Sequence, residues 1–117
     1  MLFICYPKCS TCQKAKKWLD DNNIVYEERH IVNDNPSYDE LKKWSMLANI
    51  SLNKLFNTSG ILYREMNLKE KLSSMSDDEK LKLLASNGML VKRPLLILDN
   101  NVLVGFKEAI WNSVINE

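Results

Sequence analysis

Two cysteines separated by two residues, Cys9 and Cys12, are the side chains in this sequence best suited to chemistry. They follow a short apolar run and precede a lysine-rich amphipathic run, so we expect a strand that leads through a loop into a helix. Cys9 would then lie at the helix N-terminus, where unpaired backbone N–H groups and the helix dipole stabilise an anion. Because the thiolate is the reactive form, we predict that Cys9 has a lowered pKa and is a nucleophile, with Lys8 and Lys14 adding positive charge nearby.

Cys12 should be the more buried of the two thiols. It shares a helical stripe with Ala15 and Leu19, and this stripe is expected to face the sheet. A thiol in that position can resolve a mixed disulfide on Cys9 by forming a Cys9–Cys12 bond. This chemistry needs only the two thiols, so we expect no cofactor.

Two other interpretations of the cysteines remain open. A zinc site would need two more ligands, and only Cys5 and His30 remain in the cysteine and histidine inventory. Cys5, however, lies within an apolar run, where a small buried side chain is the usual role of cysteine. We expect His30 to be a surface or edge residue, and the pair could also merely pack in the core.

The composition indicates a single domain without a strongly charged partner. The chain has 117 residues, 45% of them hydrophobic, and 16 Lys+Arg against 15 Asp+Glu. This balance favours neither nucleic acid nor a membrane surface as a direct partner, and no run approaches the roughly 20 apolar residues of a spanning helix. Because the N-terminus shows no signal-peptide pattern, we expect a cytoplasmic protein, in which three cysteines fit one redox pair and a spare thiol.

The pattern along the chain predicts strand, helix, strand, a helical block, a hairpin and a last helix. Ser10 or Thr11 is expected to cap the first helix, and Gly88 is expected to be the C′ residue that closes the helical block. Capping signals mark three helix starts within this block, at Ser37, Asn67 and Ser76. The expected strands cover residues 2–6, 24–31, 95–98 and 102–105, and the expected first and last helices end near residues 21 and 115.

This order of elements is that of a thioredoxin-like α/β fold with a mixed four-stranded sheet. A right-handed crossover makes the first two strands parallel. The helical block, residues 33–88, is expected to be an insertion between the second and third strands. It carries too little apolar surface to fold alone, so we expect residues 1–32 and 89–117 to form the core of one domain, 1–117.

The chain resembles the arsenate reductase family that also contains the Spx and MgsR regulators. Three segments carry the resemblance: Tyr6–Ala15 around the cysteines, Arg93–Ile97, and Leu103–Phe106. The resemblance implies a thioredoxin-like fold, a cytoplasmic bacterial protein and a cis peptide before Pro94 that faces the cysteine loop. It also implies that Arg93 presents a guanidinium that can pair with an anion or stabilise a thiolate.

These observations favour a redox protein, and leave open whether it is an enzyme. In the first interpretation it is a thiol–disulfide oxidoreductase in which Cys9 attacks, Cys12 resolves, and thioredoxin or a low-molecular-weight thiol regenerates the pair. The resemblance implies an alternative, a redox-sensing transcriptional regulator that binds the α-subunit of RNA polymerase. Arsenate reduction is a third and weaker interpretation, because only Cys9 and Arg93 match the catalytic groups of the reductases.

Overall fold

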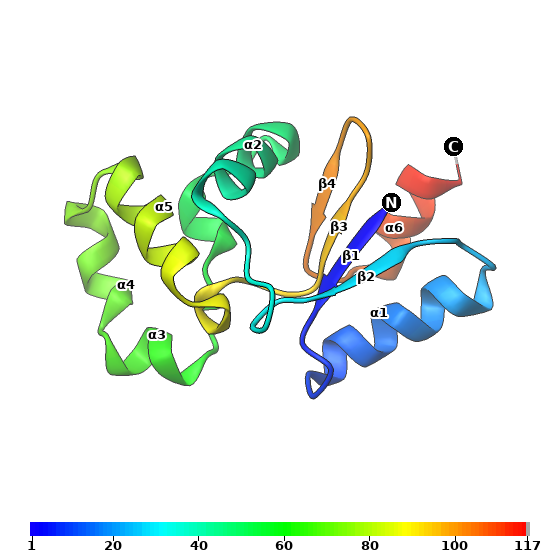
Figure 1. Ribbon diagram of the computed structural model, residues 1–117, viewed down its shortest axis with the longest axis horizontal. Coiled ribbons are helices and arrows are strands. Elements are labelled where there is room, and N and C mark those ends of the chain that lie inside the picture. Colours follow the sequence, from blue (N-terminus) through cyan, green and yellow to red (C-terminus); the bar gives the residue numbers. More distant parts are fainter. Residues whose placement is uncertain (117) are drawn as a thin grey trace.

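A computed structural model describes residues 1–116 as one four-stranded sheet with helices on both of its faces (Figure 1). The strand order is β2-β1-β3-β4; β1 is parallel to β2 and antiparallel to β3, which is antiparallel to β4. The predicted α/β class, mixed sheet and C-terminal hairpin are therefore confirmed, and β1 is central as its apolar sequence indicates. The strands are β1 Leu2–Cys5, β2 Glu27–His30, β3 Leu95–Ile97 and β4 Val102–Val104.

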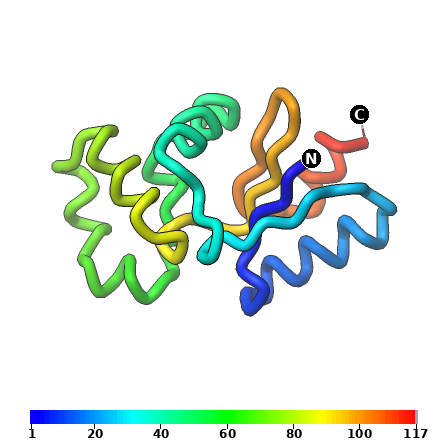
Figure 2. Tube along the Cα trace, viewed as in Figure 1, coloured from blue at the N-terminus to red at the C-terminus, as the bar shows by residue number. Residues whose placement is uncertain are grey.

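The helices form two groups. α1 and α6 lie on one side of the sheet, and α2, α3, α4 and α5 gather on the other side (Figures 1 and 2). The second group lies between β2 and β3 in the chain. The helices are α1 Ser10–Asp21, α2 Tyr38–Ala48, α3 Ile61–Glu65, α4 Leu68–Lys71, α5 Asp77–Ser86 and α6 Glu108–Ile115, with short 3-10 turns η1 Leu52–Leu55, η2 Leu72–Ser74 and η3 Gly88–Leu90.

The alternation of side chains along the strands divides the core into two clusters. In β1, Phe3 and Cys5 pack with α1 and α6, while Ile4 packs with the helices of the other group. The same period of two operates in the hairpin, where Leu96 and Leu103 face the first cluster. Successive strand residues point to opposite faces, so Cys5 lies on the face of the sheet that α1 covers.

β2 is shorter than predicted. Residues 24–31 were expected to form it, but only Glu27–His30 pair with β1, in register with Leu2–Cys5. The chain before it makes a turn, with Asn23 in the left-handed region at φ 56°, and Val25 is 90% exposed. β2 is an edge strand, so it can extend only as far as β1, its single neighbour. This explains why the strand is short although the residues before it favour β-structure.

Two of the three predicted capping signals are confirmed. Ser37 and Ser76 each accept a hydrogen bond from the backbone N–H three residues later, and the Glu at that position bonds back to the cap residue. Asn67 precedes α4 but does not cap it. Its backbone is left-handed at φ 54°, and its side-chain amide donates to Glu70 at 3.1 Å instead.

Gly88 has a different role from the one predicted. It begins η3 instead of ending α5 in a left-handed C′ conformation, and Gly105 is the glycine with positive φ among the described residues. A Cβ at position 88 would lie 1.8 Å from the backbone oxygen of Ile31. Close approach of two backbones, rather than helix termination, therefore requires glycine at this position.

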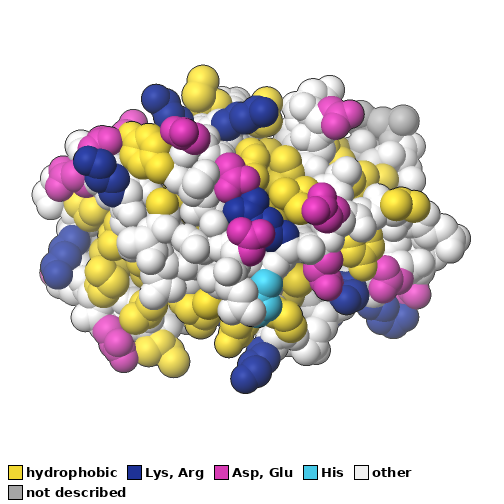
Figure 3. Space-filling model, in the orientation of Figure 1, with side chains coloured by type: hydrophobic (Ala, Val, Ile, Leu, Met, Phe, Trp, Pro, Cys, Tyr) yellow, Lys and Arg dark blue, Asp and Glu magenta, His cyan; other side chains and the backbone are white. Residues whose placement is uncertain are grey.

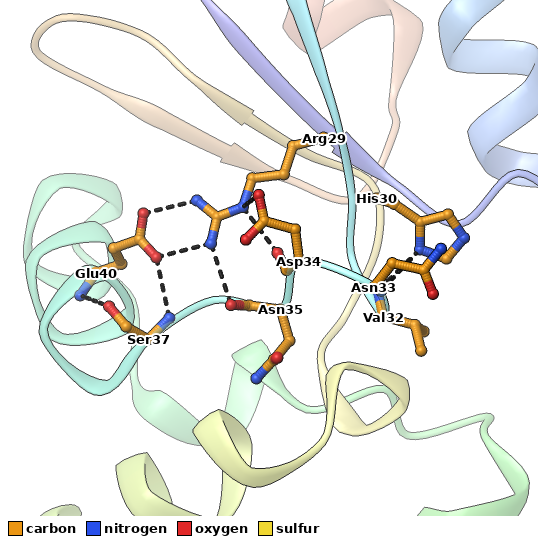
Figure 4. A network of polar contacts seen from close by, with 8 residues as sticks. All are labelled: Arg29, His30, Val32, Asn33, Asp34, Asn35, Ser37 and Glu40. Atoms are coloured by element: carbon orange, nitrogen blue, oxygen red, sulfur yellow. Dashed lines mark hydrogen bonds and ion pairs between the residues drawn. The ribbon is translucent and has the colours of Figure 1, made fainter.

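An ion-pair network joins the end of β2 to the start of α2 (Figure 4). The terminal nitrogens of Arg29 donate to the two carboxylate oxygens of Glu40 at 2.6 and 2.8 Å, and Arg29 also donates to the backbone oxygens of Asp34 and Asn35. Hydrogen bonds from Arg29 are the main reason why the pKa of Glu40 is lowered to about 2. The network fixes the direction in which the chain leaves the sheet.

Charges of both signs are mixed over the face of the molecule shown in Figure 3. Within residues 1–116, every helix falls short of the length and apolar character that crossing a bilayer requires.

Candidate active site at Cys9 and Cys12

Cys9 itself occupies the N-cap position of α1. Its backbone is extended, its N–H donates to the Tyr6 oxygen at 2.9 Å, and its carbonyl accepts the first helical hydrogen bond, from Gln13, at 3.0 Å. The prediction that Ser10 or Thr11 caps this helix is therefore wrong, because the loop from β1 delivers the thiol to that position. Cys9 is partly exposed, so a reactant can reach its sulfur.

The environment of Cys9 favours the thiolate. Burial by itself raises the pKa of a thiol, but here hydrogen bonding from Cys12, from the Arg93 side chain and from the Thr11 backbone outweighs burial, so the pKa of Cys9 lies below its ordinary value of 9.0. These donors belong to the first helical turn and to the residue before Pro94. A lowered pKa on an accessible thiol is the property of a nucleophilic cysteine.

Cys12 is in the opposite situation. It is 2% exposed, and its sulfur accepts a hydrogen bond from the Tyr6 backbone N–H at 3.4 Å. Burial, and secondly the proximity of Cys9, raise its pKa to about 12. The predicted stripe is confirmed, since Ala15 and Leu19 on the same side of α1 are fully buried.

Arg93 stands beside this pair. The peptide bond between Arg93 and Pro94 is cis, as the resemblance implied. The guanidinium lies over the Tyr6 ring, with its central carbon 4.9 Å from the ring centroid. One terminal nitrogen of Arg93 is buried and has no hydrogen-bond partner among the described residues, so it retains a free donor next to the thiols.

A cleft of about 450 Å³ opens over Cys9. The end of β4 and the start of α6 form one wall, where Gly105 has φ 74° and donates from its N–H to the Pro94 oxygen at 2.8 Å. The turn before α3 also contributes to the lining. The lining includes Cys9, Thr11, Asn57, Ser59, Gly60, Ile61, Met89, Lys92, Arg93, Phe106 and Lys107.

The third thiol lies behind the pair. Cys5 is buried, its sulfur is 3.9 Å from a carboxylate oxygen of Glu28, and burial followed by the charge of Glu28 raises its pKa to about 11. Glu28 also pairs with Lys16 at 2.8 Å. Cys5 is thus a protonated core thiol, in keeping with the buried role predicted for it.

The described part of the chain does not support the zinc alternative. Across residues 1–116, no group of three or more His, Cys, Asp or Glu side chains is arranged to hold a metal ion. His30 instead accepts hydrogen bonds at its Nδ1 atom from the backbone N–H groups of Val32 and Asn33, both at 3.1 Å (Figure 4). Its role is to close the turn after β2.

Sequence reasoning missed part of the site. Lys8 and Lys14 are exposed and are not among the main causes of the Cys9 pKa shift. The cations on the cleft lining are instead Lys92, Arg93 and Lys107. Adjacency to Arg93 could have pointed to Lys92, but nothing in the sequence indicates that Lys107, the residue before α6, lines the same cleft as Cys9.

Comparison with known proteins gives consistent results. The model of the ArsC family matches residues 5–114. The Bacillus subtilis protein YusI is 55% identical over 108 residues, covering 92% of both chains, and the regulatory protein MgsR of the same organism is 29% identical over 106 residues, covering 91% of this chain and 82% of its own. Regulators named Spx are also among the relatives.

The fold is found in solved structures as well. The crystal structure of an ArsC family related protein from Bacteroides fragilis superposes with a TM-score of 0.94 at 54% identity, over 97% of this chain and 95% of that one. The thioredoxin-like fold class is thereby confirmed.

Proposed function

The chain belongs to the ArsC family, and from that premise we propose that it is a thiol–disulfide redox protein with Cys9 as the nucleophile and Cys12 as the resolving thiol. One observation carries the proposal. Two thiols in one helical turn have opposite properties, since Cys9 is accessible with a lowered pKa and Cys12 is buried with a raised one. Reduction of a disulfide by an internal thiol pair requires one thiol that attacks and a second that resolves the mixed disulfide.

The reaction proceeds in two exchanges. The Cys9 thiolate attacks one sulfur of a substrate disulfide, a Cys9–substrate bond forms, the substrate S–S bond breaks, and the other substrate sulfur leaves as a thiolate that takes up a proton. Cys12 then loses its proton and attacks the Cys9 sulfur, which releases the second substrate thiolate. The substrate gains two electrons, and the protein ends with a Cys9–Cys12 disulfide.

The raised pKa of Cys12 explains why the two exchanges occur in this order. Part of the increase comes from the neighbouring Cys9, whose negative charge disappears once its sulfur is in a mixed disulfide. Cys12 therefore becomes easier to deprotonate only after the first exchange. Arg93 has the complementary role, because its guanidinium stabilises the Cys9 thiolate before attack.

The oxidised pair must be reduced again for turnover. We propose thioredoxin or a low-molecular-weight thiol as the source of the two electrons, acting in the cytoplasm. The cleft over Cys9 is the route by which either reductant reaches the disulfide.

Three single variants test the assignment, with reduction of a small aryl disulfide as the assay. Cys9→Ser is expected to abolish turnover. Cys12→Ser is expected to keep the first exchange and to accumulate a mixed disulfide detectable by mass spectrometry. Cys5→Ala is the control and should retain turnover; a Cys9→Ser protein that reduces the substrate at the wild-type rate would show that the assignment is wrong.

A second candidate function is redox-dependent transcriptional regulation. The similarity to the regulatory protein MgsR favours it, since the same disulfide could bias a conformation that binds the RNA polymerase α-subunit. The measurement is capture of that subunit by the reduced and the oxidised protein. Equal or absent capture in both states would count against regulation.

Arsenate reduction remains the weakest candidate, because Arg93 is the one arginine on the cleft lining and an oxyanion needs several charge-assisted donors.

A further inference from the structure

The cleft over Cys9 adjoins a second cleft, and together they form a groove lined by five cations. The first cleft, of about 450 Å³, is lined by Lys92, Arg93 and Lys107 in addition to Cys9. The second, of about 520 Å³, is lined by Lys54, Lys69, Lys92 and Lys107. The two clefts adjoin, since both are lined by Lys92, Val104 and Lys107, and the groove that they form extends from the nucleophile to η1 and α4.

The lysines are placed by separate elements of the fold. Lys54 lies on η1 and Lys69 on α4. The N–H of Lys92 donates to the oxygen of Leu55 at 2.7 Å, which ties the segment before β3 to η1. The Lys92 side chain also lies against Gly105, with its Cε 3.2 Å from the place a Cβ would occupy.

The groove concentrates positive charge in a chain that is nearly neutral. It carries five of the 16 Lys and Arg residues of a chain whose net charge is +1. None of the acidic residues described by the structure is on the lining of either cleft. Lys54, Lys69 and Lys107 are exposed, and no ion pair joins them to a described carboxylate.

From this arrangement we infer that the substrate of Cys9 is a disulfide in an acidic polypeptide segment, whose carboxylates follow the groove towards Lys54 and Lys69. This inference rests on the proposed function and names its substrate class. Charge complementarity selects the partner, and apolar side chains on the lining, among them Ile61, Leu62 and Phe106, contact its uncharged parts. The exchange is the one already described, with the polypeptide disulfide reduced and the Cys9–Cys12 bond formed.

The shape and composition of the groove favour a polypeptide over other anions. A small anionic disulfide bound at Cys9 would occupy the first cleft and would not need the lysines of the second. Single-stranded nucleic acid is bound by exposed aromatic side chains between cations. Here Phe56 is fully buried, and the partly exposed rings of Tyr63 and Phe106 are each packed against another aromatic ring, that of Phe56 and that of Trp111.

The test compares two disulfide peptides of equal length, one with Asp and Glu near its cysteines and the other with Asn and Gln in their place. The wild-type protein is expected to reduce the acidic peptide with a kcat/KM about tenfold higher, since two exposed ion pairs together are worth about that factor. The double variant Lys54→Gln, Lys69→Gln should lose most of this preference and reduce the neutral peptide as before. The matched control Lys17→Gln, Lys43→Gln removes the same charge elsewhere and should keep the preference.

Several results would overturn the inference. Equal rates with both peptides in the wild type, or a preference that survives in the Lys54→Gln, Lys69→Gln protein, contradict it. Loss of glutathione disulfide reduction in that variant would assign the lysines to a small anion, and competition by a single-stranded oligonucleotide at equal concentration would assign the groove to nucleic acid. If the wild type reduces neither the peptides nor the aryl disulfide, the proposed function fails as well; if it reduces the aryl disulfide but does not prefer the acidic peptide, only the inference fails.

Discussion

At the scale of single residues, the proposed redox function depends on the different surroundings of two chemically identical side chains, Cys9 and Cys12. Their positions make them different, because Cys9 lies at the N-terminus of α1, beside unpaired backbone N–H groups, while the Cys12 side chain is buried in the core. The spacing of the cysteines and the buried stripe predicted this division. The Tyr6 ring under Arg93 was not predicted, since no local pattern records which ring a distant guanidinium will cover.

The lowered pKa of Cys9 leads to a prediction about pH dependence. Alkylation of Cys9 requires the thiolate, so its rate should rise with pH around a midpoint below that of an ordinary thiol. Arg93→Ala removes a group that stabilises the thiolate, so the midpoint should move to higher pH. Lys8→Ala serves as the control and should leave it in place. The opposite pattern, a shift with Lys8→Ala and none with Arg93→Ala, would show that diffuse loop charge controls the thiol.

At the scale of elements, two contacts join the sheet to the helical block: the close approach of Gly88 to Ile31, and the Arg29–Glu40 ion pair. The first of these requires a residue without a side chain. Gly88 packs directly against the Ile31 backbone. Gly88→Ala is expected to lower the free energy of unfolding by about 3 kcal/mol, because neither backbone can move without disturbing β2 or η3. Gly60→Ala is the comparison, because the nearest atom to a Cβ there is the end of the Asn57 side chain at 2.8 Å, and the nearest backbone atom is the Asn57 oxygen at 3.2 Å. Denaturant unfolding of both variants measures the difference, and equal losses would contradict this role for Gly88.

The Arg29–Glu40 pair is the other connection, and it should make stability depend on pH. The pKa of Glu40 is lowered to about 2 in the folded protein. A lowered carboxyl pKa stabilises the fold above the unfolded value near 4.5, and this contribution is lost as the pH falls towards 2. Glu40→Gln is expected to cost roughly 1–3 kcal/mol at neutral pH and to flatten stability between pH 4.5 and 2. An unchanged pH profile would mean that the pair contributes nothing there.

Element types were more predictable from the sequence than element boundaries. Capping boxes at Ser37 and Ser76 and short apolar runs are local signals, and the helices and strands that they predicted are present. The end of β2 and the role of Gly88 depend on contacts with segments distant in sequence. Local patterns therefore could not predict that Val25 stays outside the sheet, or that Gly88 meets Ile31.

At the scale of the whole molecule, the sheet is the shared support of two cores. The helices between β2 and β3 bury their apolar side chains against Ile4 and Leu95, on the face opposite to the thiols. We propose that residues 33–88 do not fold without this support. An isolated 33–88 peptide is expected to show little helical circular dichroism, because short helices without a packed face are marginal in water. Native-like helix content in that peptide would instead make it a separate domain.

The most direct test of the central claim is to map the disulfide that forms when the wild-type protein meets one equivalent of oxidant. The proposed function predicts a Cys9–Cys12 bond, a free Cys5, and full reversal by reduced thioredoxin or a small thiol. Peptide mass spectrometry after alkylation of the remaining thiols identifies the bond. A protein in which Cys9 and Cys12 stay reduced, or in which either one pairs with Cys5 instead, would contradict it.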